Sequence, residues 1–361
     1  MSAKKKNNST AATVLLIAVI ILGFVVYQNR FGIKSVESGR VIMTFDSSQS
    51  HSFAAQRGRI ITLSNDRLAA SSQNGANVWE HIQNMMKPVM QIAGTMTLQF
   101  EAGGNDIALY DNGSKLWEYK TEQTIITAKT NNRGYTALVT YEMGYNSKIT
   151  IINPKGDPIY IWQVSEVYVI DVDIASDCRY FAVAALLPDK QPLTTKISIA
   201  DIHLEKIIGE VERSDSLVAS IKYVSGNDLI AVGESELLCL SGGGQLKWAV
   251  DFGGRLLESF HINYNGSTAL AFESTRNNSV VEIYGKKGVK TGEHTTDEKV
   301  TSLDMLNNRV CAASGNHVTF LSLSGRATAH IETERDIKQA LLLSPKKAAV
   351  ISGNSVAIVT P

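Results

Sequence analysis

The chain has 361 residues and a formal net charge of zero, and 19% of its residues are charged, against about a quarter in typical soluble proteins. No nucleic acid is expected as a partner, because phosphate binding requires a basic surface that this neutral composition does not supply. A hydrophobic fraction of 44% argues against a disordered chain.

The N-terminus predicts a membrane anchor. Residues 1–10 are basic and are predicted to form a cytoplasmic tail, and residues 11–27 (AATVLLIAVIILGFVVY) follow without a charge. A helix of that length spans roughly 25 Å, which is enough for a bilayer core. Bulky and charged residues come next, where a signal-peptidase site needs small ones, so we expect an uncleaved transmembrane signal-anchor. The lysines at positions 4–6 predict a single pass through the cell membrane, with the N-terminus cytoplasmic and the rest outside.

Residues 28–38 are predicted to be a linker, and residues 39–361 an extracytoplasmic domain built from a repeated hairpin. The repeat is clearest at residues 106–120 (DIALYDNGSKLWEYK), where alternation and an Asn-Gly turn predict two antiparallel strands. In most copies an aromatic residue follows the turn glycine four positions later. The pairs are Gly75 with Trp79, Gly113 with Trp117, Gly156 with Tyr160 and Gly244 with Trp248.

The copies recur about every forty residues, which is the period of a four-stranded propeller blade. Weaker copies follow at Gly288 and Gly325, and one copy near residues 201–205 lacks the glycine. We therefore predict an all-β protein, a β-propeller. We interpret the four aromatic residues as structural, filling the wedge between neighbouring blades, because their spacing follows the period of the fold. They are Trp79, Trp117, Tyr160 and Trp248.

The two ends of the domain are predicted to meet in one blade. Residues 337–360 read as three strands, and the chain ends where a turn and a fourth strand would come. The alternating run at residues 40–45 can supply that strand and so remove the open edges of the ring. This arrangement gives about eight blades. Seven blades remain the alternative, if residues 52–56 do not form the inner strand of the first repeat.

The repeats resemble a known group of propellers. The runs at residues 109–117 (LYDNGSKLW) and 240–248 (LSGGGQLKW) are similar to the tryptophan-docking repeats of quinoprotein-like (WD40-like) propellers, over about residues 40–361. With its N-terminal anchor, the whole chain resembles uncharacterised membrane-anchored propeller proteins of Gram-positive bacteria. The resemblance implies an extracytoplasmic ring and no particular activity. The quinone chemistry of such dehydrogenases uses adjacent cysteines, which this chain lacks.

No pattern in the sequence predicts catalysis, a cofactor or a metal site. The motifs of serine hydrolases, zinc proteases and P-loop proteins are absent. Asp171, Asp173 and Asp177 are spaced like calcium ligands, but the glycine and the distal glutamate of a calcium loop are missing. The cysteines at 178, 239 and 311 lie in different repeats, and we expect buried thiols at Cys239 and Cys311. We therefore predict a protein that is not an enzyme.

Function is expected on the face where the longest connections emerge. Residues 83–90, 142–147, 186–195 and 273–279 are predicted to be extended loops, and strand parity places all four on one face of the ring. Flexible methionine side chains suit protein contacts. We therefore propose a partner-binding face made of Met85, Met86, Tyr145, Leu187 and Leu193. The alternative is that Met85, Met86 and Met90 plug the first blade and the other loops are tolerated insertions.

These observations predict a non-enzymatic interaction scaffold or sensor at the cell envelope. Its expected partners are the lipid bilayer, through the N-terminal helix, and an envelope protein. The alternative is a binder of cell-wall glycan or another small ligand at the propeller mouth, because a ring creates a concave axial site. A quinone-dependent or hydrolytic enzyme ranks third, for want of a catalytic set.

Overall fold

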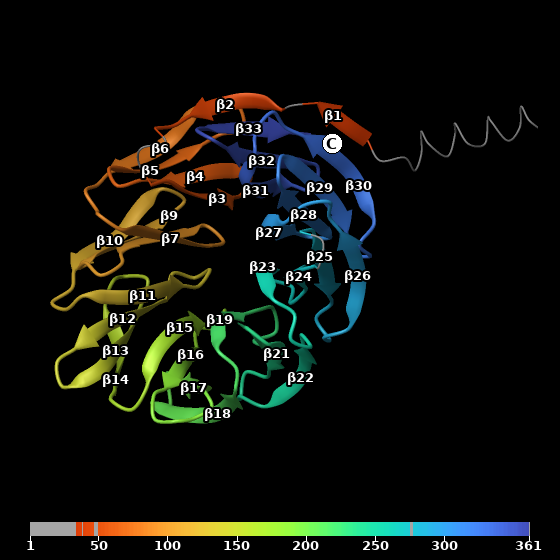
Figure 1. The fold of residues 1–361 in the computed structure, drawn as a ribbon. Helices are drawn as coiled ribbons and strands as arrows, with labels where there is room; N and C mark the ends of the chain where they lie inside the picture. The colour runs from red at the N-terminus through yellow and green to blue at the C-terminus, as the bar shows by residue number, and fades with distance from the viewer. Residues whose placement is uncertain (1–33, 38, 47–49, 275–276, 361) are drawn as a thin grey trace, which may run out of the picture.

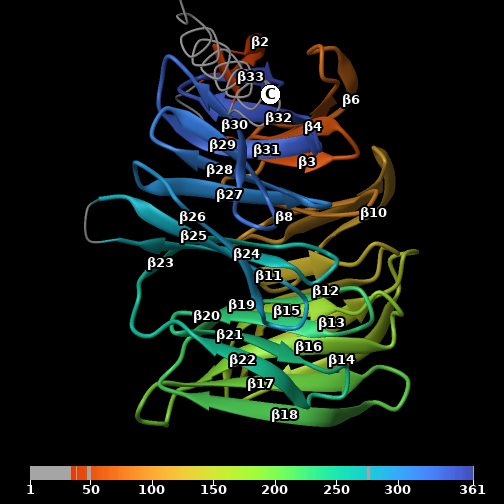
Figure 2. The ribbon, with the colours of Figure 1, turned by 90° about the vertical axis from the view of Figure 1, so that its right-hand side faces the viewer.

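The computed structural model describes residues 34–37, 39–46, 50–274 and 277–360. These residues form eight blades around a central axis (Figure 1). Each blade has four strands, which we call inner, second, third and outer in order from the axis to the rim. Figure 2 views the ring from its side, with the strands running between its two faces. The predicted all-β, eight-bladed propeller is confirmed, and the alternative of seven blades is wrong.

Seven blades are contiguous in sequence, and in each the chain runs from the inner strand to the outer one. Blade 1 has β3 (Ser52–Gln56), β4 (Arg59–Leu63), β5 (Arg67–Ser71) and β6 (Asn77–Ile82). Blade 2 has β7 (Pro88–Ala93), β8 (Met96–Glu101), β9 (Asp106–Asp111) and β10 (Ser114–Lys120). Blade 3 has β11 (Ile125–Thr130), β12 (Thr136–Glu142), β13 (Tyr145–Ile152) and β14 (Pro158–Val164). Blade 4 has β15 (Tyr168–Ile174), β16 (Tyr180–Leu187), β17 (Thr194–Asp201) and β18 (Lys206–Ser214).

The second half of the ring follows the same plan. Blade 5 has β19 (Val218–Tyr223), β20 (Leu229–Gly233), β21 (Glu236–Leu240) and β22 (Leu246–Asp251). Blade 6 has β23 (Leu257–Ile262), β24 (Thr268–Glu273), β25 (Ser279–Tyr284) and β26 (Lys290–Thr295). Blade 7 has β27 (Val300–Leu306), β28 (Arg309–Ser314), β29 (His317–Ser322) and β30 (Ala327–Glu332).

Blade 8 joins the two ends of the domain. It contains β31 (Ile337–Ser344), β32 (Lys347–Ser352), β33 (Ser355–Val359) and, as its outer strand, β2 (Arg40–Thr44). The strand β2 pairs antiparallel with β33, with Arg40 opposite Ile358. The predicted closure by the N-terminal strand is therefore confirmed, as is the predicted inner strand at residues 52–56.

The burial of each strand follows from its place in the blade. Second and third strands are covered on both sides by neighbouring blades, so β20 (LIAVG) and β21 (ELLCL) are buried along their whole length. Outer strands face solvent on one side, and β22 (LKWAVD) accordingly alternates between exposed and half-buried residues. The core is thus a series of apolar layers between adjacent blades. Cys239 and Cys311 are buried in these layers, as predicted.

A short strand extends the rim of blade 7. Residues 34–37 form β1 (Lys34–Glu37), which pairs parallel with β30, so this sheet has five strands. The sequence predicted only a linker at this position. An outer strand leaves one row of backbone groups unpaired, and any adjacent segment able to extend can pair with it. The chain therefore reaches the ring along the rim of blades 7 and 8 (Figure 1).

The connections divide between two faces. We call the face with the turns from inner to second and from third to outer strands the turn face. The loop face carries the connections from second to third strands and from each outer strand to the next blade. Within the part of the chain that the structure describes, no helix is long and apolar enough to cross a membrane. The predicted anchor at residues 11–27 lies outside that part.

Candidate partner-binding face

In the connection between blades 1 and 2, the two predicted methionines differ in exposure. Asn65 binds this loop, because its side-chain amide donates to the carbonyl oxygens of Met85 (3.0 Å) and Met86 (2.9 Å). The Met85 side chain is buried at 6% exposure, whereas Met86 is 84% exposed. Only Met86 therefore presents its side chain to a partner. Met90 lies on β7 and packs against the apolar layer between blades 1 and 2.

The predicted extended loop at residues 142–147 is wrong. The strands β12 and β13 continue to a two-residue turn, Met143 and Gly144, and Tyr145 is already the first residue of β13. Gly144 adopts the positive φ that such a tight turn needs. The turn nevertheless exposes apolar side chains on the loop face. Tyr145 is 40% exposed and Met143, which the sequence analysis did not select, is 78% exposed.

The two predicted residues in the loop of blade 4 also differ in exposure. Leu187 ends β16 and packs against the apolar layer between blades 3 and 4. Leu193, at the end of the loop, is exposed. Of the five predicted residues, the structure therefore places Met86, Tyr145 and Leu193 on the surface of the loop face.

Several exposed apolar residues accompany these three. They lie at strand ends on the loop face of blades 2, 3 and 4, where each blade offers at least one large side chain. Together with the three predicted residues we call them the apolar arc: Met86, Val89, Ile126, Tyr141, Met143, Tyr145, Tyr168 and Leu193. The missed members carried a signal in the sequence, because each is an apolar residue near the first or last position of a strand or in a tight turn.

The aromatic residues of the repeat contact the next blade. Trp79 on β6 lies against the turn glycine of blade 2, where a Cβ added to Gly113 would be 2.5 Å from the indole ring. Trp117 approaches Gly156 in the same way, and Trp248 approaches Gly288. Tyr160 packs against Phe181, with the ring centroids 5.4 Å apart. These four side chains therefore lie at joints between blades, near the rim and away from the apolar arc.

A second candidate site lies on the axis of the ring. The inner strands of blades 2 to 6 line a cavity of about 520 Å³. Its walls carry polar and charged side chains, among them Asn132, Asp173, Lys222 and His261. The hydroxyl of Tyr223, which also lines the cavity, is buried and has no hydrogen-bond partner in the described part of the chain. The cavity could accept a small polar ligand.

Side chains bridge every joint between blades around this axis. Lys129 forms an ion pair with Asp171 across the joint of blades 3 and 4 (2.5 Å), and Asp171 also accepts a hydrogen bond from the backbone of Ile221 in blade 5 (2.9 Å). Similar contacts complete the circle, which we call the axial belt. They join Lys222 to Ile262, His261 to Asp304, Asp304 to Leu342, Gln339 to Phe53, Gln56 to Met96, and Gln91 to Thr130.

Burial near the axis shifts the pKa values of three side chains, Asp173, Asp304 and His261. Burial raises the pKa of Asp173 to about 6, and it raises the pKa of Asp304 to about 6 as well. Burial and the nearby Lys222 lower the pKa of His261 to about 3. Asp171 and Asp173, the residues spaced like calcium ligands, accept hydrogen bonds from Ile221 and Tyr223. No cluster of three or more potential metal ligands occurs within the described ranges.

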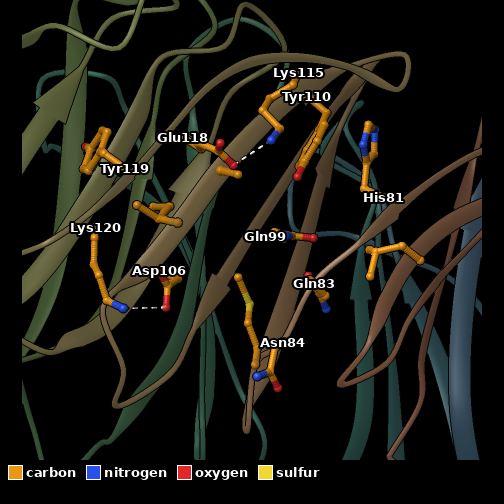
Figure 3. Close-up of a pocket in the computed structure, with 14 residues that line it drawn as sticks. His81, Gln83, Asn84, Gln99, Asp106, Tyr110, Lys115, Glu118, Tyr119 and Lys120 are labelled. Carbon is orange, nitrogen blue, oxygen red and sulfur yellow. Dashed lines mark hydrogen bonds and ion pairs between the residues drawn. The ribbon is translucent and has the colours of Figure 1, made fainter.

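A pocket of about 450 Å³ lies between the outer parts of blades 1 and 2 (Figure 3). Met85 lines it, together with Gln99, whose side-chain carbonyl is buried without a partner among the described residues. The pairs of Lys115 with Glu118 (2.6 Å) and Lys120 with Asp106 (3.7 Å) flank it. Similar grooves occur at other joints, between blades 3 and 4 and between blades 8 and 1. The pocket is therefore a recurring feature of the ring.

A buried acid anchors the joint between blades 5 and 6. Glu282 on β25 accepts two hydrogen bonds from Arg255 (3.0 and 3.1 Å), one from Tyr284 (2.6 Å) and one from Lys290 (3.0 Å). Burial alone would raise the pKa of Glu282, but the hydrogen bonds from these partners outweigh it and hold the pKa at about 2. The carboxylate is thus charged at neutral pH and fixes the loop that enters blade 6.

Solved structures of propellers resemble this ring. BamB from Moraxella catarrhalis aligns with a TM-score of 0.56 and 13% identity over 88% of this chain and 100% of that chain. The C-terminal WD40 domain of Sif2 aligns with a TM-score of 0.65 and 12% identity, over 90% of this chain and 99% of that domain's chain. Sqt1 of Chaetomium thermophilum, in a structure with the N-terminus of the ribosomal protein L10 bound, aligns with a TM-score of 0.61 and 9% identity. The alignment covers 90% of this chain and 100% of that chain. At these identities the likeness establishes the fold alone.

Sequence comparison leads to a family without an assigned role. No curated protein matches the chain. A family described as a family of unknown function, DUF5711, matches residues 33–360, which covers the entire propeller and the strand β1. The chain therefore belongs to the DUF5711 family.

Proposed function

We propose that this protein is a membrane-anchored, non-enzymatic scaffold that binds a protein partner through the apolar arc on the outer side of the cell membrane. The observation that carries the proposal is the arc itself. Large apolar side chains are exposed in the turns and at the strand ends on the loop face of three consecutive blades. Such a surface is costly in water and is typical of a protein-binding site.

Two further observations support the proposal. Residues 11–27 have the length and composition of a transmembrane helix. Sqt1, which has the same fold, has been seen bound to the N-terminus of another protein. The resemblance of the repeats to quinoprotein-like propellers, and of the whole chain to anchored propellers of Gram-positive bacteria, agrees with an extracytoplasmic ring.

A comparison of matched surface variants tests the proposal. The full-length protein is crosslinked in native membranes and recovered in three forms: unchanged, with Tyr141→Ser, Met143→Ser and Leu193→Ser, and with Leu204→Ser, Tyr264→Ser and Val289→Ser. The second triplet removes equally exposed apolar side chains from outside the arc. We expect one envelope protein to be recovered with the unchanged and control forms and lost with the arc variant. Equal recovery from all three forms would contradict the partner-binding role of the arc.

Membrane topology needs a separate measurement. A Ser9→Cys variant is treated with a membrane-impermeant maleimide in intact cells and in lysed cells. The native cysteines at 178, 239 and 311 are buried, so labelling of the folded protein reports on position 9. We expect labelling only after lysis. Labelling in intact cells would contradict the cytoplasmic N-terminus.

The axial cavity supports a second candidate function, the binding of a cell-wall glycan or another small ligand. Its polar lining and the unpartnered hydroxyl of Tyr223 favour this candidate. Thermal-shift screening of soluble wall fragments tests it, with an Asn132→Trp variant that fills the cavity from its exposed edge as the control. A stabilising ligand whose effect disappears in the variant would assign binding to the axis.

A further inference from the structure

The half of the ring that receives the N-terminal segment carries opposite charges on its two faces. On the turn face of blades 6, 7, 8 and 1, every charged residue of the described turns is basic and exposed: Arg57, Lys286, Lys287, Arg326 and Lys346. On the loop face of the same blades, acidic residues predominate in the connections: Asp46, Asp66, Asp297, Glu298, Glu334 and Asp336. The neutral composition of the chain therefore conceals a segregation of charge.

Four of the basic residues are available to a partner. In the described part of the chain, Arg57, Lys286, Lys287 and Lys346 take part in no ion pair, whereas exposed lysines elsewhere, such as Lys190, pair with nearby carboxylates. The turns of the opposite half of the ring differ, because there Asp157, Asp177, Glu205 and Asp228 accompany the basic residues. The basic surface is thus confined to one half of one face.

The position of that surface coincides with the point where the chain enters the ring. The strand β1 lies along the rim of blade 7, and β2 completes blade 8. Six residues, 28–33, separate β1 from the predicted membrane span, and they can extend over roughly 20 Å at most. A bilayer that holds residues 11–27 therefore lies close to the rim of blades 7 and 8.

We infer that the turn face of blades 6, 7, 8 and 1 lies against the anionic headgroups of the membrane that holds the anchor, and this inference rests on the anchor proposed above. Each exposed lysine or arginine near an anionic bilayer strengthens the contact, since the negative surface potential attracts it within a Debye length. The acidic loop face of the same half is repelled. The ring consequently presents its loop face, with the apolar arc, away from the lipid.

The experiment uses the full-length protein in nanodiscs of phosphatidylcholine alone or of an equal mixture of phosphatidylcholine and phosphatidylglycerol. A fluorescent dye is attached either to Ser324→Cys, in a turn of blade 7, or to Glu334→Cys, on the loop face of the same blade. Both positions are exposed, and the native cysteines are buried. Phosphatidylcholine with a spin label on its headgroup then reports which dye lies closer to the bilayer.

We expect stronger quenching of the dye at position 324 than of the dye at 334 in the anionic nanodiscs, and loss of most of that difference at high salt and in phosphatidylcholine alone. The variant with Lys286→Glu, Lys287→Glu and Lys346→Glu should lose the difference as well. A control with the same charge change on the loop face, Lys87→Glu, Lys120→Glu and Lys190→Glu, should retain it. Circular dichroism melting verifies that both triple variants fold.

Two different failures are distinguishable. Equal quenching of the two dyes in a protein that enters the nanodiscs, or stronger quenching at position 334, would overturn the inference and leave the anchor intact. Failure of the full-length protein to enter either nanodisc would overturn the anchor, and with it the inference.

Discussion

At the scale of single residues, the turn glycines are constrained both by their own backbone and by the neighbouring blade. Gly113 has φ of 91°, a conformation that residues with a side chain avoid, and its missing Cβ leaves room for the ring of Trp79. The Asn-Gly sequence thus serves the hairpin and the joint between blades at the same time.

Substitution of turn glycines distinguishes the requirement for a positive φ from the requirement for space beside the Trp79 ring. We expect Gly113→Ala to lower the free energy of unfolding by about 2–4 kcal/mol, because it adds a steric clash to the backbone strain. Gly144→Ala is the control, since Gly144 also has a positive φ but no atom within 4 Å of the added Cβ, and it should cost about 1 kcal/mol. Urea denaturation measures both values. Equal losses would show that the contact with Trp79 contributes nothing.

The low pKa of Glu282 predicts a pH-dependent contribution to stability. The carboxylate has a pKa near 2 in the folded protein and near 4.5 in the unfolded chain, so it stabilises the fold above pH 4.5 and loses this effect as the pH falls toward 2. We expect Glu282→Gln to cost about 2–3 kcal/mol at pH 7 and much less near pH 2.5. Denaturation of both proteins across this pH range measures how the loss of unfolding free energy depends on pH. A loss that does not change with pH would contradict the prediction.

At the scale of strands and blades, closure depends on β2. Its residues Ile42 and Met43, with Phe45 just beyond its end, pack in the core between blades 8 and 1, and its backbone covers the edge of β33. We expect a chain that begins at Ser50 to melt at a lower temperature and to self-associate through the uncovered edge. A chain that begins at Gly39 also lacks the N-terminal residues and β1 but keeps β2, and it serves as the control. Light scattering and thermal melting distinguish them, and equal behaviour would contradict the closing role of β2.

The repeated hairpin made most of these elements predictable from sequence. Alternation and turn glycines act within a few residues, so the blades, the split closure and the inner strand at residues 52–56 were visible in the pattern. The strand β1 was not, because four residues are too few to show alternation. Met85 and Met86 are adjacent in a loop without periodicity, so the sequence could not show that one side chain is buried and the other exposed.

At the scale of the whole molecule, the axial belt connects blades that lie far apart in sequence. Asp171 binds Lys129 and Ile221, which come from two other blades. Its carboxylate therefore belongs to the ring as a unit and not to blade 4 alone. Sequence reasoning compared Asp171 with a calcium ligand because partners that are separated by a full repeat leave no local signature.

Removal of this carboxylate should weaken two joints at once. We expect Asp171→Ala to lower the free energy of unfolding by about 3–5 kcal/mol, since Lys129 would remain partly buried without its counterion. Lys115→Ala, which breaks the exposed pair with Glu118, should cost less than about 1 kcal/mol. Hydrogen exchange of the Ile221 amide, which donates to Asp171, should accelerate only in the first variant. Unchanged exchange there would contradict the role of the belt.

The strand β1 lies on the rim at the side of the ring opposite the apolar arc. The chain is held at blades 7 and 8, and the apolar arc occupies blades 2 to 4 on the far side of the axis (Figure 1). With the proposed anchor in a membrane, a tilt of the ring about blade 7 would move blades 2 to 4 farther than blades 7 and 8. A partner bound to the apolar arc would then influence the inclination of the ring.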